Sequence, residues 1–183
     1  MRAIFTTTLM LVATPARAND LRFVYYDVTG NTARQLRREL NAKGPMSYRG
    51  RVDGLAQWSV TWKYHSAPTA DGCEFTEFRA KVEGTITLPR WTPSGKFSPE
   101  LMNRWQNFLT ALRIHEHGHY SHGEQAAREI QTLGRRFRVT GNCSSIAQQF
   151  NDQAMKISDK YRAADKEYDR RTRFGWTQGV KFP

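Results

Sequence analysis

The chain has 183 residues, of which 39% are hydrophobic and 12% aromatic, as expected of one globular domain of ordinary size. This composition excludes a polytopic membrane protein, and the aromatic content excludes a disordered tail. Lysine and arginine number 28 against 17 acidic residues, which gives a formal net charge of +11. Such a charge favours anionic surroundings, for instance the surface of a cell envelope, without specifying which.

Residues 1–18 have the features of a secretory signal peptide in the usual order. Arg2 gives a positive start, a mostly apolar stretch follows at 4–12, and residues 16–18 read Ala-Arg-Ala, a small-x-small cleavage site. We therefore predict a periplasmic or secreted protein in which residues 19–183 form a single domain. No later stretch is apolar and long enough to span a membrane, so no transmembrane segment is expected after cleavage.

Export determines how the two cysteines, Cys73 and Cys143, are interpreted. In an oxidising compartment a disulfide is the expected state of a single pair. Closing a loop of about 70 residues would stabilise the fold by roughly 4 kcal/mol in the chain-entropy model. Free thiols or metal ligands are the alternative, which is less favoured because structural zinc sites usually contain closely spaced cysteine pairs.

The N-terminal half has the patterns of strands with one early helix. A stretch rich in β-formers at 21–28 precedes a short helix over 32–42. Two further runs, 58–64 and 78–88, alternate apolar and polar residues as half-buried strands do, and Pro89 is expected to end the second. We expect these two runs to pair as an antiparallel hairpin within a small antiparallel sheet.

The C-terminal half is predicted to be helical. Ser-Pro-Glu at 98–100 is a helix-start signal, and from Leu101 to Phe137 apolar residues and histidines recur at steps of three and four. A second stripe from Ile146 to Tyr168 predicts another long helix, and the short connection makes the two antiparallel. The predicted fold class is therefore α+β, with the small antiparallel sheet of the N-terminal half packed on two long antiparallel helices.

Residues 115–119, which read His-Glu-His-Gly-His, match the H-E-x-x-H pattern of zinc peptidases and fall within the first long helix. At about 100° per residue, His119 lies some 40° around the helix from His115 and one turn along it. Both imidazoles can therefore reach one tetrahedral zinc ion, and the predicted cofactor is Zn²⁺. Glu116 lies beside that metal, where its carboxylate can take a proton from a bound water.

The histidines could instead be core residues, since they continue an apolar stripe. Each ring of His115, His119 and His122 would then need partners for two nitrogens, and leaving such groups unpaired costs about 1–3 kcal/mol each. A metal with acceptors behind the rings removes this cost. His122 lies about 10 Å along the axis from His115, so we expect it to support the site or face substrate rather than bind the metal.

A third ligand must come from outside this helix. Setting the two predicted helices antiparallel brings Asp165 and Asp169 nearest to the level of His115, and either could complete a His-His-Asp site. In the same register Tyr168 or Tyr161 could donate a hydrogen bond to the oxyanion of a tetrahedral intermediate. A solvated acidic face is an equally good interpretation of the two aspartates.

Taken together, these features resemble the predicted secreted zinc-dependent proteases, a bacterial domain family of otherwise unknown function. The resemblance rests on an ordered set of pieces over most of the chain: Tyr25-Tyr26-x-Val28-x-Gly30, Trp58-x-Val60-x-Trp62-x-Tyr64, Cys73, Leu88-Pro89-x-Trp91, Trp105-x-x-Phe108, residues 115–119, Cys143, Tyr168-Asp169-x-x-Thr172 and Gly175-x-x-Gln178-Gly179. It implies a zinc peptidase-like domain with a zincin-like active-site helix, in which His115 and His119 bind zinc and Glu116 is the catalytic base. It also favours Asp169 over Asp165 as the third ligand.

One position departs from the family's pattern. Phe174 stands where family members often have a histidine, so a ligand supplied there in relatives would be absent from this chain.

The sequence thus predicts an exported zinc metallopeptidase acting on a peptide or protein substrate, with Glu116 as general base and Tyr168 as a second catalytic group. The alternative is a non-enzymatic, envelope-associated binding protein whose metal site is structural or degenerate. Arginine clusters within 34–38, 135–138 and 170–173 are interpreted as solvated faces, and export argues against nucleic acid as a partner.

Overall fold

The structure is a computed structural model that describes residues 19–182, so the predicted signal peptide at 1–18 lies outside the described residues. The helices and strands are, in chain order, β1 (Asn19–Thr29), α1 (Ala33–Lys43), β2 (Met46–Ser47), β3 (Gly50–Arg51), β4 (Leu55–Pro68), β5 (Gly72–Thr92), α2 (Pro99–Gly134), β6 (Arg138–Thr140) and α3 (Ile146–Thr172). Short 3₁₀ helices, Cys143–Ser145 and Trp176–Gln178, flank α3. The predicted α+β class is confirmed.

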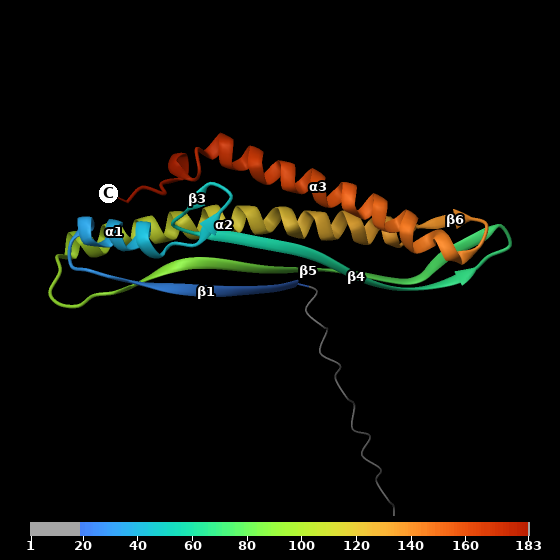
Figure 1. Ribbon diagram of the computed structural model, residues 1–183, viewed down its shortest axis with the longest axis horizontal. Coiled ribbons are helices and arrows are strands. Elements are labelled where there is room, and N and C mark those ends of the chain that lie inside the picture. The colour runs from blue at the N-terminus through green and yellow to red at the C-terminus, as the bar shows by residue number, and fades with distance from the viewer. Residues whose placement is uncertain (1–18, 183) are drawn as a thin grey trace, which may run out of the picture.

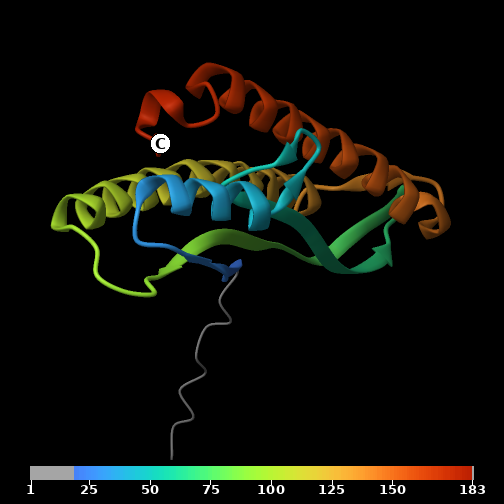
Figure 2. The ribbon, with the colours of Figure 1, turned by 60° about the vertical axis from the view of Figure 1, so that its left-hand side comes forward.

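These elements form layers (Figure 1). The sheet lies along one face of α2, and α3 lies on the side of α2 that is remote from the sheet. Figure 2 shows α1 and the β2–β3 hairpin on the same side of the sheet as α2. The 36-residue α2 is therefore covered on two sides, which agrees with its long buried stripe. Among the residues that the structure describes, no helix is both long and apolar enough to cross a membrane.

The sheet has the order β1-β5-β4, and the short β6 also pairs with β5. β4 and β5 form the predicted antiparallel hairpin. β1 differs from the expected antiparallel arrangement because it runs parallel to β5, with Val28 opposite Trp91. After β1 the chain passes through α1 and the β2–β3 hairpin, and β4 then begins at the end of the sheet where β1 finishes. β5 runs back antiparallel to β4 and lies between β1 and β4. The alternation of apolar and polar residues along a strand predicts which side chains face the helices, but it does not predict which strand lies next to it or in which direction.

β5 is longer than the predicted run at 78–88 and continues through Pro89 to Thr92. The pairing of β4 with β5 begins at Leu55 opposite Thr87, so Pro89 lies beyond the end of β4. Its missing N–H therefore removes no ladder hydrogen bond on that side, and the strand can continue.

α2 begins as predicted and ends earlier than predicted. The hydroxyl of Ser98 accepts the N–H of Leu101 at 3.1 Å, and the proline at position 99 is the first helical residue. The helix ends at Gly134 rather than Phe137, because the chain turns there to pair residues 138–140 with β5. The turn keeps Phe137 buried, since its ring packs into an aromatic cluster with Phe75 and Phe150.

The predicted disulfide is present. Cys73 at the start of β5 and Cys143 after β6 are bonded across 70 residues of sequence. The bond ties the β4–β5 hairpin to the connection between α2 and α3, so it restrains the end of the molecule that is remote from α1 (Figure 1).

Replacing both cysteines with alanine should lower the free energy of unfolding by about 4 kcal/mol, because the unfolded chain regains the entropy of an open loop. Urea denaturation of the oxidised protein and of the double variant measures the difference. The free energy of unfolding of each single variant, compared with that of the reduced wild type, is the control for packing lost at that position. An unchanged free energy of unfolding in the double variant would contradict this prediction.

Candidate metal centre

Residues 115–119 lie near the middle of α2, on a stretch of regular helix. Helical spacing places His115 and His119 on the side that α3 covers, where the centroids of their rings are 4.9 Å apart. His115 is only 5% exposed. α3 crosses this part of α2 and brings Asp165 and Asp169 to the two rings.

Three possible ligand atoms converge between the two helices. Asp169 Oδ1 lies 3.3 Å from His115 Nε2 and 3.1 Å from His119 Nε2, and the three residues can hold one metal ion. Ligand atoms bound tetrahedrally to zinc at about 2.0–2.1 Å are themselves about 3.3 Å apart. The two distances to Asp169 Oδ1 are close to this spacing, so the group is compatible with a bound zinc ion. The structure thus brings together the three residues that the sequence predicted as zinc ligands.

The other nitrogen of each ring has an acceptor of its own. His115 Nδ1 lies 2.9 Å from Gln178 Oε1, and His119 Nδ1 lies 3.0 Å from Asp165 Oδ1. A proton on Nδ1 satisfies both acceptors and leaves each Nε2 lone pair directed at the point of convergence. This is the tautomer and the support that metal-binding histidines generally have.

Asp165 is the centre of a second group of side chains. Its Oδ1 also lies 2.7 Å from His122 Nδ1, and its Oδ2 accepts the Trp58 N–H at 2.8 Å. His119, His122 and Asp165 could also hold a cation. However, the 2.7 Å from Asp165 Oδ1 to His122 Nδ1 is well below the spacing of tetrahedral ligands, and His119 would have to turn its Nδ1 rather than its Nε2 to such a cation. The group therefore fits a supporting role, with Asp165 orienting His119 and with His122 and Trp58 orienting Asp165.

Two glycines of α2 permit these contacts. A Cβ atom at Gly118 would overlap the hydroxyl of Tyr168, and one at Gly123 would overlap the ring of Trp58. Tyr168 and Trp58 can therefore approach the helix backbone only because these two positions lack a side chain.

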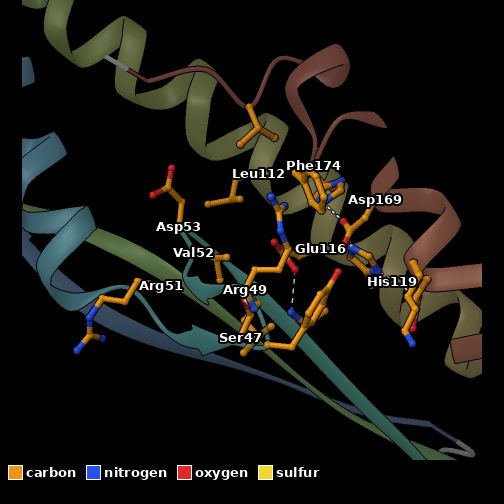
Figure 3. Close-up of a pocket in the computed structure, with 18 of the residues that line it drawn as sticks. Ser47, Arg49, Arg51, Val52, Asp53, Leu112, Glu116, His119, Asp169 and Phe174 are labelled. Atoms are coloured by element: carbon orange, nitrogen blue, oxygen red, sulfur yellow. Dashed lines mark hydrogen bonds and ion pairs between the residues drawn. The ribbon is translucent and has the colours of Figure 1, made fainter. Parts of the chain in front are cut away.

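Glu116 is on the adjacent side of α2 and faces the start of β4. Its side chain is buried, and its Oε2 accepts the N–H of Ala56 at 2.7 Å (Figure 3). Burial raises the pKa of Glu116, although the neighbouring histidines and the Ala56 N–H oppose the shift. A raised pKa makes the carboxylate a stronger base, which suits a group that accepts and then returns a proton.

His119 and Asp169 stabilise each other's charged forms in the metal-free protein. Burial disfavours the imidazolium, but hydrogen bonds to Asp165 and Asp169 outweigh burial and raise the pKa of His119 to about 10. Burial likewise disfavours the charged form of Asp169, yet hydrogen bonds from His115 and His119 hold the pKa of that carboxyl well below its ordinary value. A metal must therefore displace the proton of His119, so its affinity should increase with pH.

The point of convergence opens into a cavity of about 470 Å³. His115, Glu116, His119 and Asp169 line it from the helices, and residues 47–49 and 51–56 line it from the opposite side (Figure 3). A cavity of this size is in the range that holds small ligands, and it gives access to the candidate metal ligands and to Glu116.

The two tyrosines, either of which was predicted to donate to an oxyanion, lie at different distances from the candidate metal ligands. The ring of Tyr168 stacks on His115 at 5.1 Å, and its hydroxyl is hydrogen-bonded to Gln178. Tyr168 is not among the residues that line the cavity, so its position favours holding His115 over the predicted catalytic contact. Tyr161 donates to Glu129 at 2.9 Å, because the crossing of α3 over α2 places it further along α2 than the predicted register does.

Gln178 is a site residue that pattern analysis missed. After α3 the chain turns back through Arg173, Phe174 and Gly175, which have φ values of 51°, 56° and 79°. The turn returns the 3₁₀ helix at 176–178 to α2, where Gln178 meets His115. The only sign of this residue in the sequence was its place in the family-like motif near the C-terminus.

The shifted pKa of His119 predicts that the metal-free protein loses stability as the pH rises. The folded-state pKa lies above the unfolded value of about 6.5, so this contribution is complete below about pH 6.5 and is lost towards pH 10. The contribution of Asp169 has the opposite sense, being present above about pH 3.8 and lost in strong acid. We expect the Tm of chelator-treated protein to fall between about pH 6 and 9, and His119→Gln to flatten this slope. An equal slope in the variant would contradict this origin.

Comparison with known proteins adds a family but no activity. Residues 23–175 match the family described as "Bacterial protein of unknown function (DUF922)", a region that runs from within β1 to just beyond α3. No curated protein and no solved structure matches the chain. Because the match covers most of the sequence, the chain belongs to this bacterial family.

Proposed function

We propose that the protein is a zinc-dependent hydrolase that cleaves amide bonds in peptides or proteins. The observation that carries this proposal is the convergence of His115 Nε2 and His119 Nε2 on Asp169 Oδ1, at 3.3 and 3.1 Å, at the wall of a cavity that Glu116 also lines. Among residues 19–182, no fourth histidine, cysteine or acid joins this group. Three protein ligands and an accessible fourth position are typical of catalytic zinc, whereas structural zinc has four protein ligands.

The proposed chemistry is hydrolysis by an activated water molecule. Zinc, when bound, lowers the pKa of a water ligand and polarises the carbonyl of the scissile amide. Glu116 accepts a proton from the water that attacks the carbonyl carbon, and it then donates that proton to the nitrogen of the departing amine as the C–N bond breaks. Its hydrogen bond from Ala56 holds the carboxylate in place, and its raised pKa suits a group that gains and loses a proton in each turnover.

The proposal includes a location outside the cytoplasm. Disulfides such as Cys73–Cys143 persist in oxidising compartments and are rare in cytosolic proteins. Together with the predicted signal peptide, this supports a periplasmic or secreted enzyme, and the positive charge suits the anionic surface of an envelope.

The direct test is Glu116→Gln. Metal analysis should find about one zinc ion per chain in both wild type and variant, whereas cleavage of unfolded casein, followed by mass spectrometry, should fall by about 10²- to 10⁴-fold in the variant. Glu77→Gln, at an exposed position of β5, is the matched control and should cleave as the wild type does.

Two outcomes would contradict the proposed function. Wild-type turnover by Glu116→Gln would reject the mechanism. A zinc-loaded wild type that cleaves neither casein nor a diverse peptide library would instead favour the non-enzymatic alternative, an envelope-associated binding protein with a structural metal site.

Asp165→Ala should weaken zinc binding by about ten- to a hundredfold, because His119 loses the acceptor that orients its ring and fixes its tautomer. Competition with a chromogenic chelator measures the affinity, and far-UV circular dichroism checks the fold. Asp159→Ala, at an exposed position of the same helix, should bind zinc as the wild type does. Equal affinities for all three proteins would show that His119 does not depend on Asp165.

A further inference from the structure

The cavity beside the metal group has a cationic rim. Arg49 and Arg51 line it from the β2–β3 hairpin, and Lys166 lines it from α3. Arg37 lines it as well, but the carboxylate of Asp53 binds its guanidinium at 2.8 and 2.9 Å and neutralises it. The other three cations have no carboxylate partner within residues 19–182.

The floor of the cavity does not neutralise this charge. Glu116, Asp165 and Asp169 contribute three carboxylates, and a divalent metal on Asp169 would offset two of those charges. Three cations at the rim then exceed the negative charge that remains. The field in the cavity therefore favours a substrate that carries an anionic group.

Arg49 combines charge with a fixed position near the metal ligands. Its Cζ atom lies 3.4 Å from the centroid of the Phe174 ring, so the side chain reaches from the hairpin to the end of α3 (Figure 3). A guanidinium that stacks on an aromatic ring can still donate from its edge, and its paired N–H groups match the two oxygens of a carboxylate. No hydrogen bond links the Arg49 guanidinium to another described residue, so these donors are available to a ligand.

The backbone holds both members of this stack in place. The hydroxyl of Ser47 accepts the N–H of Arg49 at 3.1 Å and donates to the carbonyl of Gly50 at 3.0 Å, which closes the hairpin turn. Phe174 has a φ of 56°, a value that bulky residues seldom adopt, and its N–H donates to the carbonyl of Asp169 at 2.8 Å. This conformation belongs to the turn that ends α3. Phe174 is 43% exposed, so its ring is not buried in the core and lies against the Arg49 guanidinium instead.

We propose that Arg49 binds a carboxylate of the substrate close to the scissile amide, which makes acidic peptides the substrate class. The carboxylate is either the free C-terminus of the peptide or an acidic side chain, and both present the same two oxygens. Arg51, which donates to the carbonyl of Gly44 at 2.8 Å, and Lys166 add attraction from the rim. This inference rests on the proposed function, because it assigns Arg49 to the cavity of the same metal group.

The test uses hydroxamates, which chelate zinc, so that binding is measured without turnover. Zinc-loaded protein is titrated calorimetrically with the malonyl hydroxamates of phenylalanine and phenylalaninamide, and with those of glutamic acid α-amide and glutamine amide. The first pair differs in a terminal carboxylate, the second in a side-chain carboxylate. We expect the wild type to bind the acid of at least one pair about ten- to a hundredfold more tightly than its amide.

Arg49→Gln should lose this preference and keep its affinity for the amide probes. Arg38→Gln, at an exposed position of α1 outside the cavity, is the matched control and should keep the preference. If the wild type binds acid and amide equally, or if the preference survives Arg49→Gln, the inference is overturned while the metal site stands. If the zinc-loaded protein binds none of the probes, the proposed function fails, and the inference fails with it.

Discussion

The candidate site depends on the contact between α2 and α3 at the level of the histidines. Without Asp165 and Asp169, buried imidazole nitrogens would lack partners, and each unpaired group would cost about 1–3 kcal/mol. With them, His119 has an acceptor at each nitrogen, and Asp169 Oδ1 also faces His115 Nε2. α3 is therefore more than a cover for the apolar stripe of α2, because it supplies one possible metal ligand and the support of another.

The rest of the fold keeps α3 in this position. At one end the Cys73–Cys143 disulfide and the aromatic cluster around Phe150 fix its start against the sheet. At the other end the turn after α3 brings the C-terminal segment back over α2, where Phe182 packs against Trp105. Both ends of α3 are thus tied to the sheet–α2 unit, so the carboxylates are held on a rigid element, which is what a metal site needs.

Sequence reasoning predicted the parts of this site that follow from local periodicity. The spacing of His115 and His119 places them on one face of a helix whatever the rest of the chain does. The choice between Asp165 and Asp169 depends on how α3 crosses α2, which periodicity does not determine, and only the family resemblance favoured Asp169. Gln178 and the parallel pairing of β1 depend on contacts between distant segments, and no local pattern encodes either of them.

Phe174 is the position at which the resemblance suggested a missing ligand, and the candidate metal group does not depend on it. Three ligand atoms converge without any contribution from position 174, and the ring there contacts Arg49 instead. Phe174 lines the same cavity as the three candidate ligands, and its ring contacts a cation at the rim of that cavity. In the proposed enzyme this position therefore bears on the choice of substrate rather than on the binding of the metal.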